Sequence, residues 1–279
     1  AAPVSKRNIL GVVDTVGLEI GGQVLRARSL AQKTQEIIGG KATHPVCGIP
    51  GGMSKPLAEE DRAKIEEWSK ELVNFAKFTA GLLDDVVLKN EAYLGLIKDP
   101  GIYYHETYYM GMVDKNNKIN FYDGDIRVVD QKGKEFVKFK PADYLQHIGE
   151  HVEPWSYEKF TFLKKIGWKG FTDGPGSGIY RAAPLARINA SNGFTTPLAQ
   201  AEYERMKGFF KDLGVDGPIH HTLVYHWARV IELVHAAELM QECAQDPIIT
   251  SKDIKAKAGT PGEGVGVLEA PRGTLYHHY

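Results

Sequence analysis

The feature that most constrains the fold is a long apolar stripe between residues 65 and 86. Its side chains recur at alternating intervals of three and four residues, which is the repeat of one face of an α-helix. They are Ile65, Trp68, Leu72, Phe75, Thr79, Leu82 and Val86. Ser54 or Pro56 is a suitable start, and the acidic run at residues 59–61 puts negative charge where the helix dipole favours it. A helix of roughly 30 residues is about 45 Å long, so we expect it to pack in a bundle.

Three other stretches predict helices of the same body. Residues 5–38, 197–213 and 218–244 carry apolar side chains at helix-like intervals, and each stretch is closely followed by glycine or proline, which end helices. We therefore assign residues 1–98 and 197–246 to a helical body.

The apolar period changes from helical to alternating between Tyr103 and Phe139. Three turn sequences divide this region into short segments, at residues 114–117, 123–125 and 131–133. The segments predict a β-rich excursion over residues 103–140, formed as an antiparallel β-meander with one face covered. We place it at the periphery of the helical body.

Composition is consistent with an α+β fold that is mainly α: a long-helix bundle with a peripheral antiparallel β-meander. With 279 residues, of which 43% are hydrophobic, the chain can bury a core, and we expect residues 1–279 to form a single domain. The formal net charge of −1 gives no basic excess that would predict a nucleic-acid partner. No apolar run reaches the length of about 18 residues that a membrane span needs, so we expect a cytoplasmic protein.

The chain contains two cysteines, Cys47 and Cys243, and neither is part of a Cys-x-x-Cys pair. In a reducing compartment we expect buried thiols rather than a disulfide. The sequence begins with Ala1 rather than methionine and stops at Tyr279, directly after an apparent strand. We interpret the chain as a fragment.

The glycine-rich C-terminal stretch leads into a predicted strand over residues 264–276 that presents one arginine. Pro271 fixes its own φ and favours an extended residue before it, so Arg272 leaves the strand in a defined direction. Gly273 permits the close approach of another backbone or a ligand. Such an arginine is either paired with a carboxylate or is a permanently charged donor directed into a site, and the residues alone leave both open.

A compact loop over residues 44–52 contains three glycines and two prolines, which disfavour regular structure. Such a loop is commonly structural. His44, which precedes Pro45, could instead be an imidazole oriented under a site, because proline restricts the backbone beside it.

Two other patterns resemble functional motifs without matching them. The glycines of residues 171–180 fit neither the Walker nor the dinucleotide spacing. His220, His221, His226 and His235 lack the i, i+4 spacing of a helical zinc site. We expect no metal to be held by this chain alone.

Several segments resemble, in order along the whole chain, those of the large, catalytic subunit of nickel-iron hydrogenases. The matching segments are Gly39-Gly40, His44-Pro45, Pro50-Gly-Gly52, Pro184-Leu-Ala-Arg187 and Glu269-Ala-Pro-Arg272. Ala183 departs from the pattern, because glycine is usual at that position. The ending His277-His278 is most similar to the cytoplasmic, cofactor-linked group, especially the methyl-viologen-reducing, F420-non-reducing type.

This resemblance implies a nickel-iron centre with carbon monoxide and cyanide ligands in the intact protein. In that family four cysteines from two Cys-x-x-Cys motifs hold the metals, one motif near each end of the polypeptide, and neither occurs here. The chain is therefore expected to be the central portion of such a protein and to be inactive alone. The implied substrate is H2. The implied partners are the iron-sulfur small subunit of a hydrogenase and, beyond it, heterodisulfide reductase or a cofactor-reducing module.

The resemblance also implies roles for four residues. Arg272 and Pro271 would overhang the metal pair as the catalytic residues, with Arg272 acting as a fixed positive charge. His44 would lie beneath the metals, and Glu269 would anchor the strand that carries Arg272.

Two other functions are compatible with the sequence. The lack of metal-binding cysteines is also found in the quinone-binding subunits of respiratory NADH dehydrogenase, which share the same ancestry. A structural or docking fragment without catalysis is the third possibility.

Overall fold

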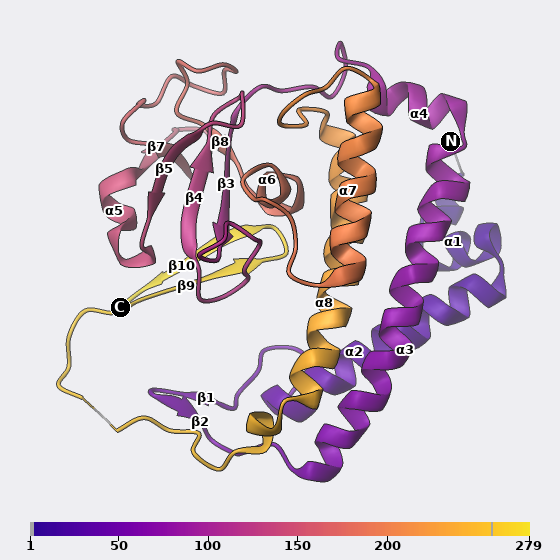
Figure 1. The fold of residues 1–279 in the computed structure, drawn as a ribbon, viewed down its shortest axis with the longest axis vertical. Coiled ribbons are helices and arrows are strands. Elements are labelled where there is room, and N and C mark those ends of the chain that lie inside the picture. Colours follow the sequence, from indigo (N-terminus) through magenta and orange to yellow (C-terminus); the bar gives the residue numbers. More distant parts are fainter. Residues whose placement is uncertain (1–2, 258) are drawn as a thin grey trace. The chain divides into compact units, whose positions relative to one another are not determined.

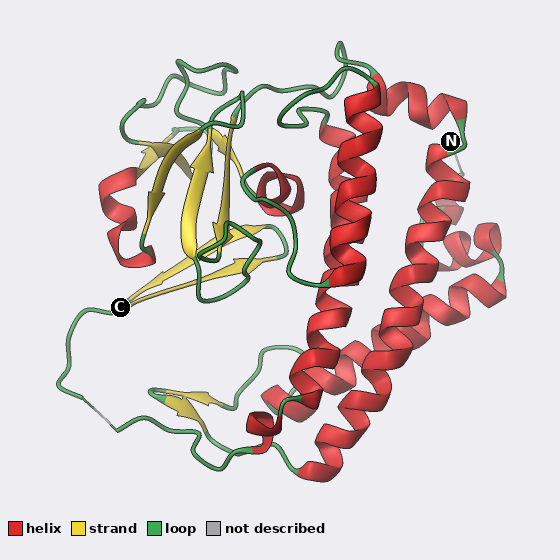
Figure 2. Cartoon of the chain, viewed as in Figure 1, coloured by secondary structure: helices red, strands yellow, loops and turns green. Residues whose placement is uncertain are grey.

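The computed structural model describes residues 3–257 and 259–279. The chain divides into two compact units, of which the first is Ala1–Thr79 with Ala236–Thr260 and the second is Ala80–His235 with Pro261–Tyr279. Helices and several small sheets are combined (Figure 2), which confirms a mixed fold rich in helix. The single domain expected over residues 1–279 stays a prediction.

Eight α-helices lie within the described residues (Figure 1). They are α1 (Ile9–Val16), α2 (Leu18–Gly39), α3 (Glu59–Leu83), α4 (Glu91–Lys98), α5 (Tyr144–His147), α6 (Ala183–Asn189), α7 (Pro197–Asp212) and α8 (Tyr225–Gln245). A π-helical turn, Asp84–Leu88, continues α3. None of the described helices is both long enough and apolar enough to cross a membrane.

The strands of the described residues form four small sheets. They are β1 (Gly48–Ile49), β2 (Gly52–Met53), β3 (Tyr108–Val113), β4 (Asp125–Val129), β5 (Glu135–Phe139), β6 (Ile148–Val152), β7 (Lys159–Leu163), β8 (Tyr180–Arg181), β9 (Val265–Ala270) and β10 (Gly273–His278).

The first unit contains α1, α2, β1, β2 and most of α3. The single helix expected over residues 5–38 is wrong, because Gly17 at φ 89° separates α1 from α2. Asn8 begins α1 by accepting a hydrogen bond from the Gly11 N–H at 3.0 Å, as N-cap residues do. Gly40, in the left-handed conformation, ends α2 at the expected place.

The buried side of α3 differs from the apolar stripe that predicted the helix. Ile65 is common to both, but within the first unit the other buried residues of α3 are Ser69, Val73 and Ala76. The larger side chains of the stripe, such as Trp68 and Phe75, are half-buried at its border. The repeat therefore identified the helix correctly and misplaced its buried face by about one residue.

The main sheet of the second unit has the strand order β5-β4-β3-β8. Strands β3, β4 and β5 pair antiparallel in chain order, as expected for residues 103–140, but β8 pairs parallel with β3. The sheet is therefore mixed, which corrects the expectation of a purely antiparallel meander.

Strand β3 is covered on both faces, since all six of its residues are buried, while the place of the sheet at the periphery of the helical body stays a prediction. Tyr108, Met110 and Met112 join an apolar cluster with residues of β6, β7 and β9. Tyr109, on the other face, packs with Ala186 of α6. The expectation of one exposed face was wrong, because α6 and the later strands cover both faces.

The C-terminal segment is a hairpin instead of the single strand expected over residues 264–276. Strands β9 and β10 pair antiparallel from Val265 with His278 to Ala270 with Gly273. Val267 is buried, whereas Leu268 is exposed. A short buried strand was expected at Val265, Val267 and Leu268; β9 confirms the strand, but Leu268 is not buried, and the turn that follows was missed.

Candidate functional site

Pro271 and Arg272 form a two-residue turn between the paired residues Ala270 and Gly273. Proline keeps φ at about −65°, and Arg272 is not among the described residues with positive φ. The turn is therefore not of the I′ or II′ type that matches the twist of paired strands. Contacts from outside the hairpin are therefore needed to stabilise this turn.

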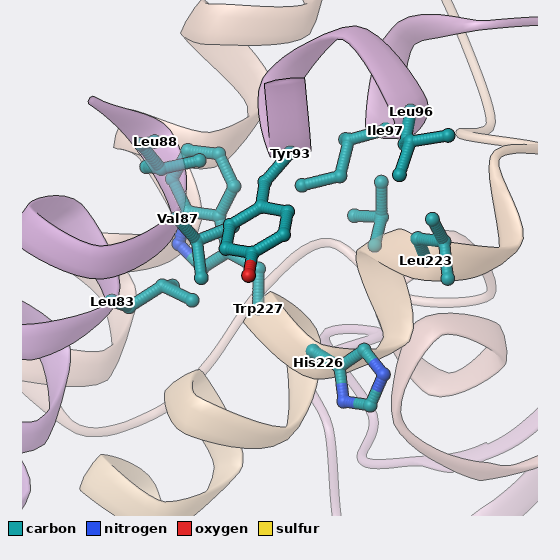
Figure 3. A pocket seen from close by; sticks show the side chains of 10 residues that line it. Leu83, Val87, Leu88, Tyr93, Leu96, Ile97, Leu223, His226 and Trp227 are labelled. Carbon is teal, nitrogen blue, oxygen red and sulfur yellow. The ribbon is translucent and has the colours of Figure 1, made fainter. Parts of the chain in front are cut away.

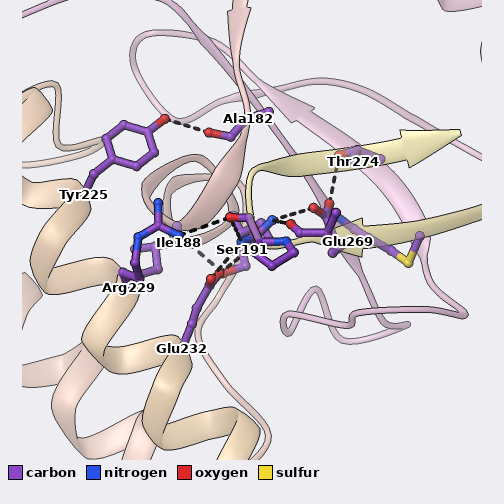
Figure 4. Close-up of polar contacts among 12 residues, drawn as sticks. Ala182, Ile188, Ser191, Tyr225, Arg229, Glu232, Glu269 and Thr274 are labelled. Atoms are coloured by element: carbon purple, nitrogen blue, oxygen red, sulfur yellow. Dashed lines mark hydrogen bonds and ion pairs between the residues drawn. The ribbon is translucent and has the colours of Figure 1, made fainter. Parts of the chain in front are cut away.

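Gly273 brings the turn against the residues that precede α6. It has φ 143°, and a Cβ atom there would lie only 2.8 Å from the Cβ atom of Ala182. The Tyr225 hydroxyl donates to the Ala182 carbonyl at 2.7 Å, which links this contact to α8 (Figure 4). The close approach expected at Gly273 is therefore made by the chain's own Ala182.

A buried arginine lies behind the turn. Arg187 of α6 is 1% exposed, and its Nε and Nη2 donate to the two carboxylate oxygens of Glu232 on α8 at 2.5 and 2.7 Å. Its Nη1 donates to Oε2 of Glu269 on β9 at 2.7 Å. One guanidinium thus connects two buried carboxylates that come from different elements; Figure 4 labels both Glu232 and Glu269.

Glu269 joins the hairpin to the main sheet. Its Oε1 accepts from the backbone N–H of Met112 on β3 at 2.8 Å and from the Thr274 hydroxyl of β10 at 2.9 Å. Glu269 thus hydrogen-bonds both β3 and β10, while its role as the anchor of the strand that carries Arg272 stays a prediction.

The backbone carbonyls next to Arg272 are held as well. Arg187 Nη1 donates to the Ala270 carbonyl at 3.0 Å, and its Nη2 donates to the Pro271 carbonyl at 3.4 Å. Arg229 Nη1 donates to the same Pro271 carbonyl at 3.3 Å. Two guanidinium groups therefore fix the peptide unit from which Arg272 begins.

Arg272 itself is exposed. Among the described residues, none forms an ion pair with its side chain. A guanidinium stays protonated at any ordinary pH and carries five N–H donors. The turn thus presents a positive charge that has no carboxylate partner among the described residues, while its direction into a site stays a prediction.

Burial and charge act against each other in the cluster behind the turn. Burial alone would lower the pKa of Arg187, but hydrogen bonds and charge from Glu232 and Glu269 outweigh it and raise that pKa. Burial raises the pKa of Glu232, and Arg187 opposes this shift. Removing one partner from such a cluster leaves an uncompensated buried charge, which costs about 3–5 kcal/mol.

The sequence analysis singled out Arg187 only as part of the Pro184–Arg187 segment, and it missed Glu232 and Arg229. Both missed residues lie in the predicted helix over residues 218–244. The available signal was a carboxylate between the apolar residues Ile231 and Leu233, since a charge within an apolar helix commonly has a partner.

His44 lies between α2 and β1, is exposed and has φ 55°. It belongs to the first unit, whereas Pro271, Arg272 and Glu269 belong to the second. The geometry within the second unit brings the latter three residues together at one hairpin. The convergence of His44 with them stays a prediction.

The two thiols have different surroundings. Cys47 is buried and Cys243 is exposed, so the expectation of two buried thiols was wrong for Cys243. In the last turn of α8 the neighbouring Ala244 occupies the buried side. Within residues 3–257 and 259–279, no three His, Cys, Asp or Glu side chains are grouped so that they could hold a metal ion.

The second unit also contains an apolar cavity of about 180 Å³ (Figure 3). It is lined by Leu83, Val87, Leu88, Tyr93, Leu96, Ile97, Leu223, Val224, His226 and Trp227. Only Tyr93, His226 and Trp227 bring side-chain polar atoms to this lining. The cavity thus offers hydrophobic contact and lacks an arrangement of acids and bases.

Comparison with known proteins gives consistent relatives, although no model of a protein family matches the sequence. The F420-non-reducing hydrogenase of Archaeoglobus profundus has an iron-sulfur subunit that is 46% identical over 280 residues, covering all of this chain and 56% of the relative. The vhu F420-non-reducing hydrogenase of Methanocaldococcus jannaschii has a subunit that is 42% identical over 98% of this chain and 61% of its own length. The chain therefore spans a little over half the length of these relatives.

Solved structures agree with the sequence relatives. The NAD+-reducing [NiFe]-hydrogenase in its H2-reduced state superimposes with a TM-score of 0.86 at 31% identity, covering 100% of this chain and 58% of the other. The Ni-Fe-Se hydrogenase of D. vulgaris Hildenborough gives a TM-score of 0.62 at 19% identity, over 95% of this chain and 57% of that chain. The second likeness concerns the fold alone.

Proposed function

We propose that this chain, a relative of the large subunits of nickel-iron hydrogenases, is the central portion of such a protein and serves the reversible heterolytic cleavage of H2 in the complete assembly. The observation that carries the proposal is the exposed Arg272 at a turn that buried charges hold from behind. The identity of 46% to a hydrogenase subunit over the whole chain supports it.

The residues of this chain do not fit the metal centre of the family. Soft thiolates suit nickel and low-spin iron, and the family centre needs four of them. The sequence contains only Cys47 and Cys243, and neither is in a Cys-x-x-Cys motif. We therefore propose that the metal ligands come from polypeptide outside these residues, and that the chain alone is inactive.

Arg272 acts in this proposal as a fixed positive charge next to the reacting molecule. A donor that is already oriented stabilises developing negative charge without paying for reorganisation. Pro271 limits the direction of the chain just before Arg272. Transfer of a proton from Arg272 is not part of the proposal, since guanidinium groups do not give up a proton in proteins.

The partners follow from the same proposal. Electrons would pass to an iron-sulfur small subunit, and from there to heterodisulfide reductase or a cofactor-reducing module. The relatives named F420-non-reducing hydrogenases favour an acceptor other than F420. We place the assembly in the cytoplasm.

The test uses the complete gene product assembled with its small subunit. Arg272→Lys is expected to lower H2-dependent dye reduction by about 100-fold, the usual loss for one oriented donor, while the nickel and iron contents stay normal. The exposed Arg26, paired with Glu71 at 2.9 Å, provides the control Arg26→Lys with normal turnover. Normal turnover of Arg272→Lys would contradict the proposal, and a preparation without nickel would favour the quinone-binding alternative.

A further inference from the structure

The hydrogen bonds of Arg187 use every donor that its guanidinium has. Nε supplies one bond, to Glu232, whereas Nη1 and Nη2 each supply two. A guanidinium has five N–H groups in a rigid planar fork. With all five engaged, its plane is fixed with respect to α8 and to the hairpin together.

Gly111 of β3 determines where this guanidinium lies. A Cβ atom at Gly111 would come within 2.9 Å of the Arg187 Cα and 3.1 Å of its Cγ. The missing side chain lets α6 lie directly on the strand. Arg187 therefore starts from a position set by the main sheet and points from there to the turn.

The buried cluster of Arg187, Glu232 and Glu269 is better suited to orienting the turn than to stabilising the fold. Buried ion pairs add little net stability compared with apolar side chains of the same volume. Three of the five bonds end on the hairpin, at Glu269, Ala270 and Pro271. The turn that they reach is of a type that paired strands do not favour.

We infer that Arg187, held by Glu232 and assisted by Arg229, is a positioning residue that fixes the Pro271–Arg272 turn in the direction that the site requires. This inference deepens the proposed function and rests on it for the meaning of that direction. Arg187 touches no reacting group itself and acts through the carbonyls beside Arg272.

The experiment is hydrogen–deuterium exchange on the complete gene product that contains these residues. Arg187→Lys keeps the positive charge but loses the planar set of five N–H donors. We expect the exchange rate in peptides covering residues 270–274 to rise about tenfold. Arg229→Gln changes an exposed residue and removes one bond to the Pro271 carbonyl, and we expect a rise of about threefold in the same peptides. Peptides covering residues 148–163 are the reference and keep their rates.

Arg127 offers a matched control in the same unit. It also donates to a carboxylate and to a carbonyl, those of Glu135 at 2.8 Å and Ala190 at 3.0 Å, and neither acceptor belongs to the hairpin. Arg127→Lys should leave residues 270–274 unchanged. An equal rise in the hairpin and the reference peptides for both Arg187→Lys and Arg229→Gln, or no rise in either, would overturn the inference.

A second measurement in the complete assembly separates this inference from the proposed function. Arg229→Gln is expected to lower kcat for H2 oxidation about threefold at unchanged KM, and Arg127→Lys is expected to leave both unchanged. If the hairpin loosens but Arg272→Lys turns over normally, the proposed function fails while the fixing of the turn by Arg187 stands. If Arg272→Lys is impaired but the hairpin exchanges normally in both hairpin variants, the positioning role fails alone.

Discussion

The two segments that carry the candidate residues are supported by different means. The turn with Arg272 depends on side-chain charges, through Arg187, Glu232 and Arg229. The loop with His44 depends on backbone, because its Val46 and Cys47 N–H groups donate to the Gly39 carbonyl at 2.8 and 3.1 Å. A segment held by glycines and backbone bonds is visible in a sequence, whereas one held by distant charges is not.

Glycines complete the backbone support of the loop. A Cβ atom at Gly52 would lie 1.9 Å from the Ile254 carbonyl oxygen. The Met53 N–H donates to that same carbonyl at 2.9 Å, and the Ala256 N–H donates to the Gly51 carbonyl at 2.7 Å. The two segments should therefore fail under different substitutions.

Removing the charge behind the turn should have the largest effect. Arg187→Met leaves Glu232 and Glu269 buried without their cation, and we expect a loss of about 3–5 kcal/mol in the free energy of unfolding. Urea titration followed by tryptophan fluorescence measures it. The double variant Arg187→Met with Glu232→Gln should regain most of the lost free energy of unfolding. If it is no more stable than Arg187→Met alone, the cause is not electrostatic.

Adding a methyl group to the loop should have the next largest effect. Gly52→Ala forces a side chain against the Ile254 carbonyl, and we expect a loss of about 2–3 kcal/mol from overpacking. The same urea titration applies. Gly48 has no atom near the position of its absent Cβ, so Gly48→Ala is the control that should change stability little.

Alkaline pH should lower the stability of the second unit, which contains the hairpin and Tyr225. Burial raises the pKa of Tyr225 from 10.0 to about 12, so the folded state resists ionisation in this range. The resulting stability is present below pH 10 and is lost as the pH rises towards 12, by about 2 kcal/mol. Stability measured from pH 9 to 12 should fall less steeply in Tyr225→Phe, and an identical slope would refute the assignment.

The smallest effect should be an increase in the free energy of unfolding. Ala183 has φ 73° beside the hairpin, a left-handed conformation that costs a residue with a Cβ atom about 1–2 kcal/mol. Ala183→Gly removes that cost and adds backbone entropy to the unfolded chain, so we expect a net gain of about 1 kcal/mol. Ala190, with φ −85°, is the control, since Ala190→Gly should destabilise in a thermal unfolding experiment.

The sequence predicted those elements whose cause is local. The helical repeat located α3, and the glycine pair placed the end of α2 correctly. The buried face of α3 was misjudged because half-buried aromatic side chains such as Trp68 can lie at the border of a face. The break at Gly17 was missed because one glycine is tolerated in many helices.

The site was only half predictable. Pro271 and Arg272 stand out by composition, but the hairpin was not anticipated because its turn lacks the usual asparagine–glycine signal. Its support comes from Arg187, which is 82 residues from Glu269 and 45 from Glu232 in sequence. Contacts over such separations depend on α6 lying on β3, and no local pattern encodes that.

The saturated guanidinium has a practical consequence for handling the protein. All five N–H groups of Arg187 are already hydrogen-bonded, so sulfate or phosphate in a buffer has no donor to bind there. The exposed guanidinium of Arg272 can bind such oxyanions. Such ions are therefore expected to bind at Arg272 on the turn and not at Arg187 behind it. Kinetic work on the assembly should begin in solutions free of multivalent anions.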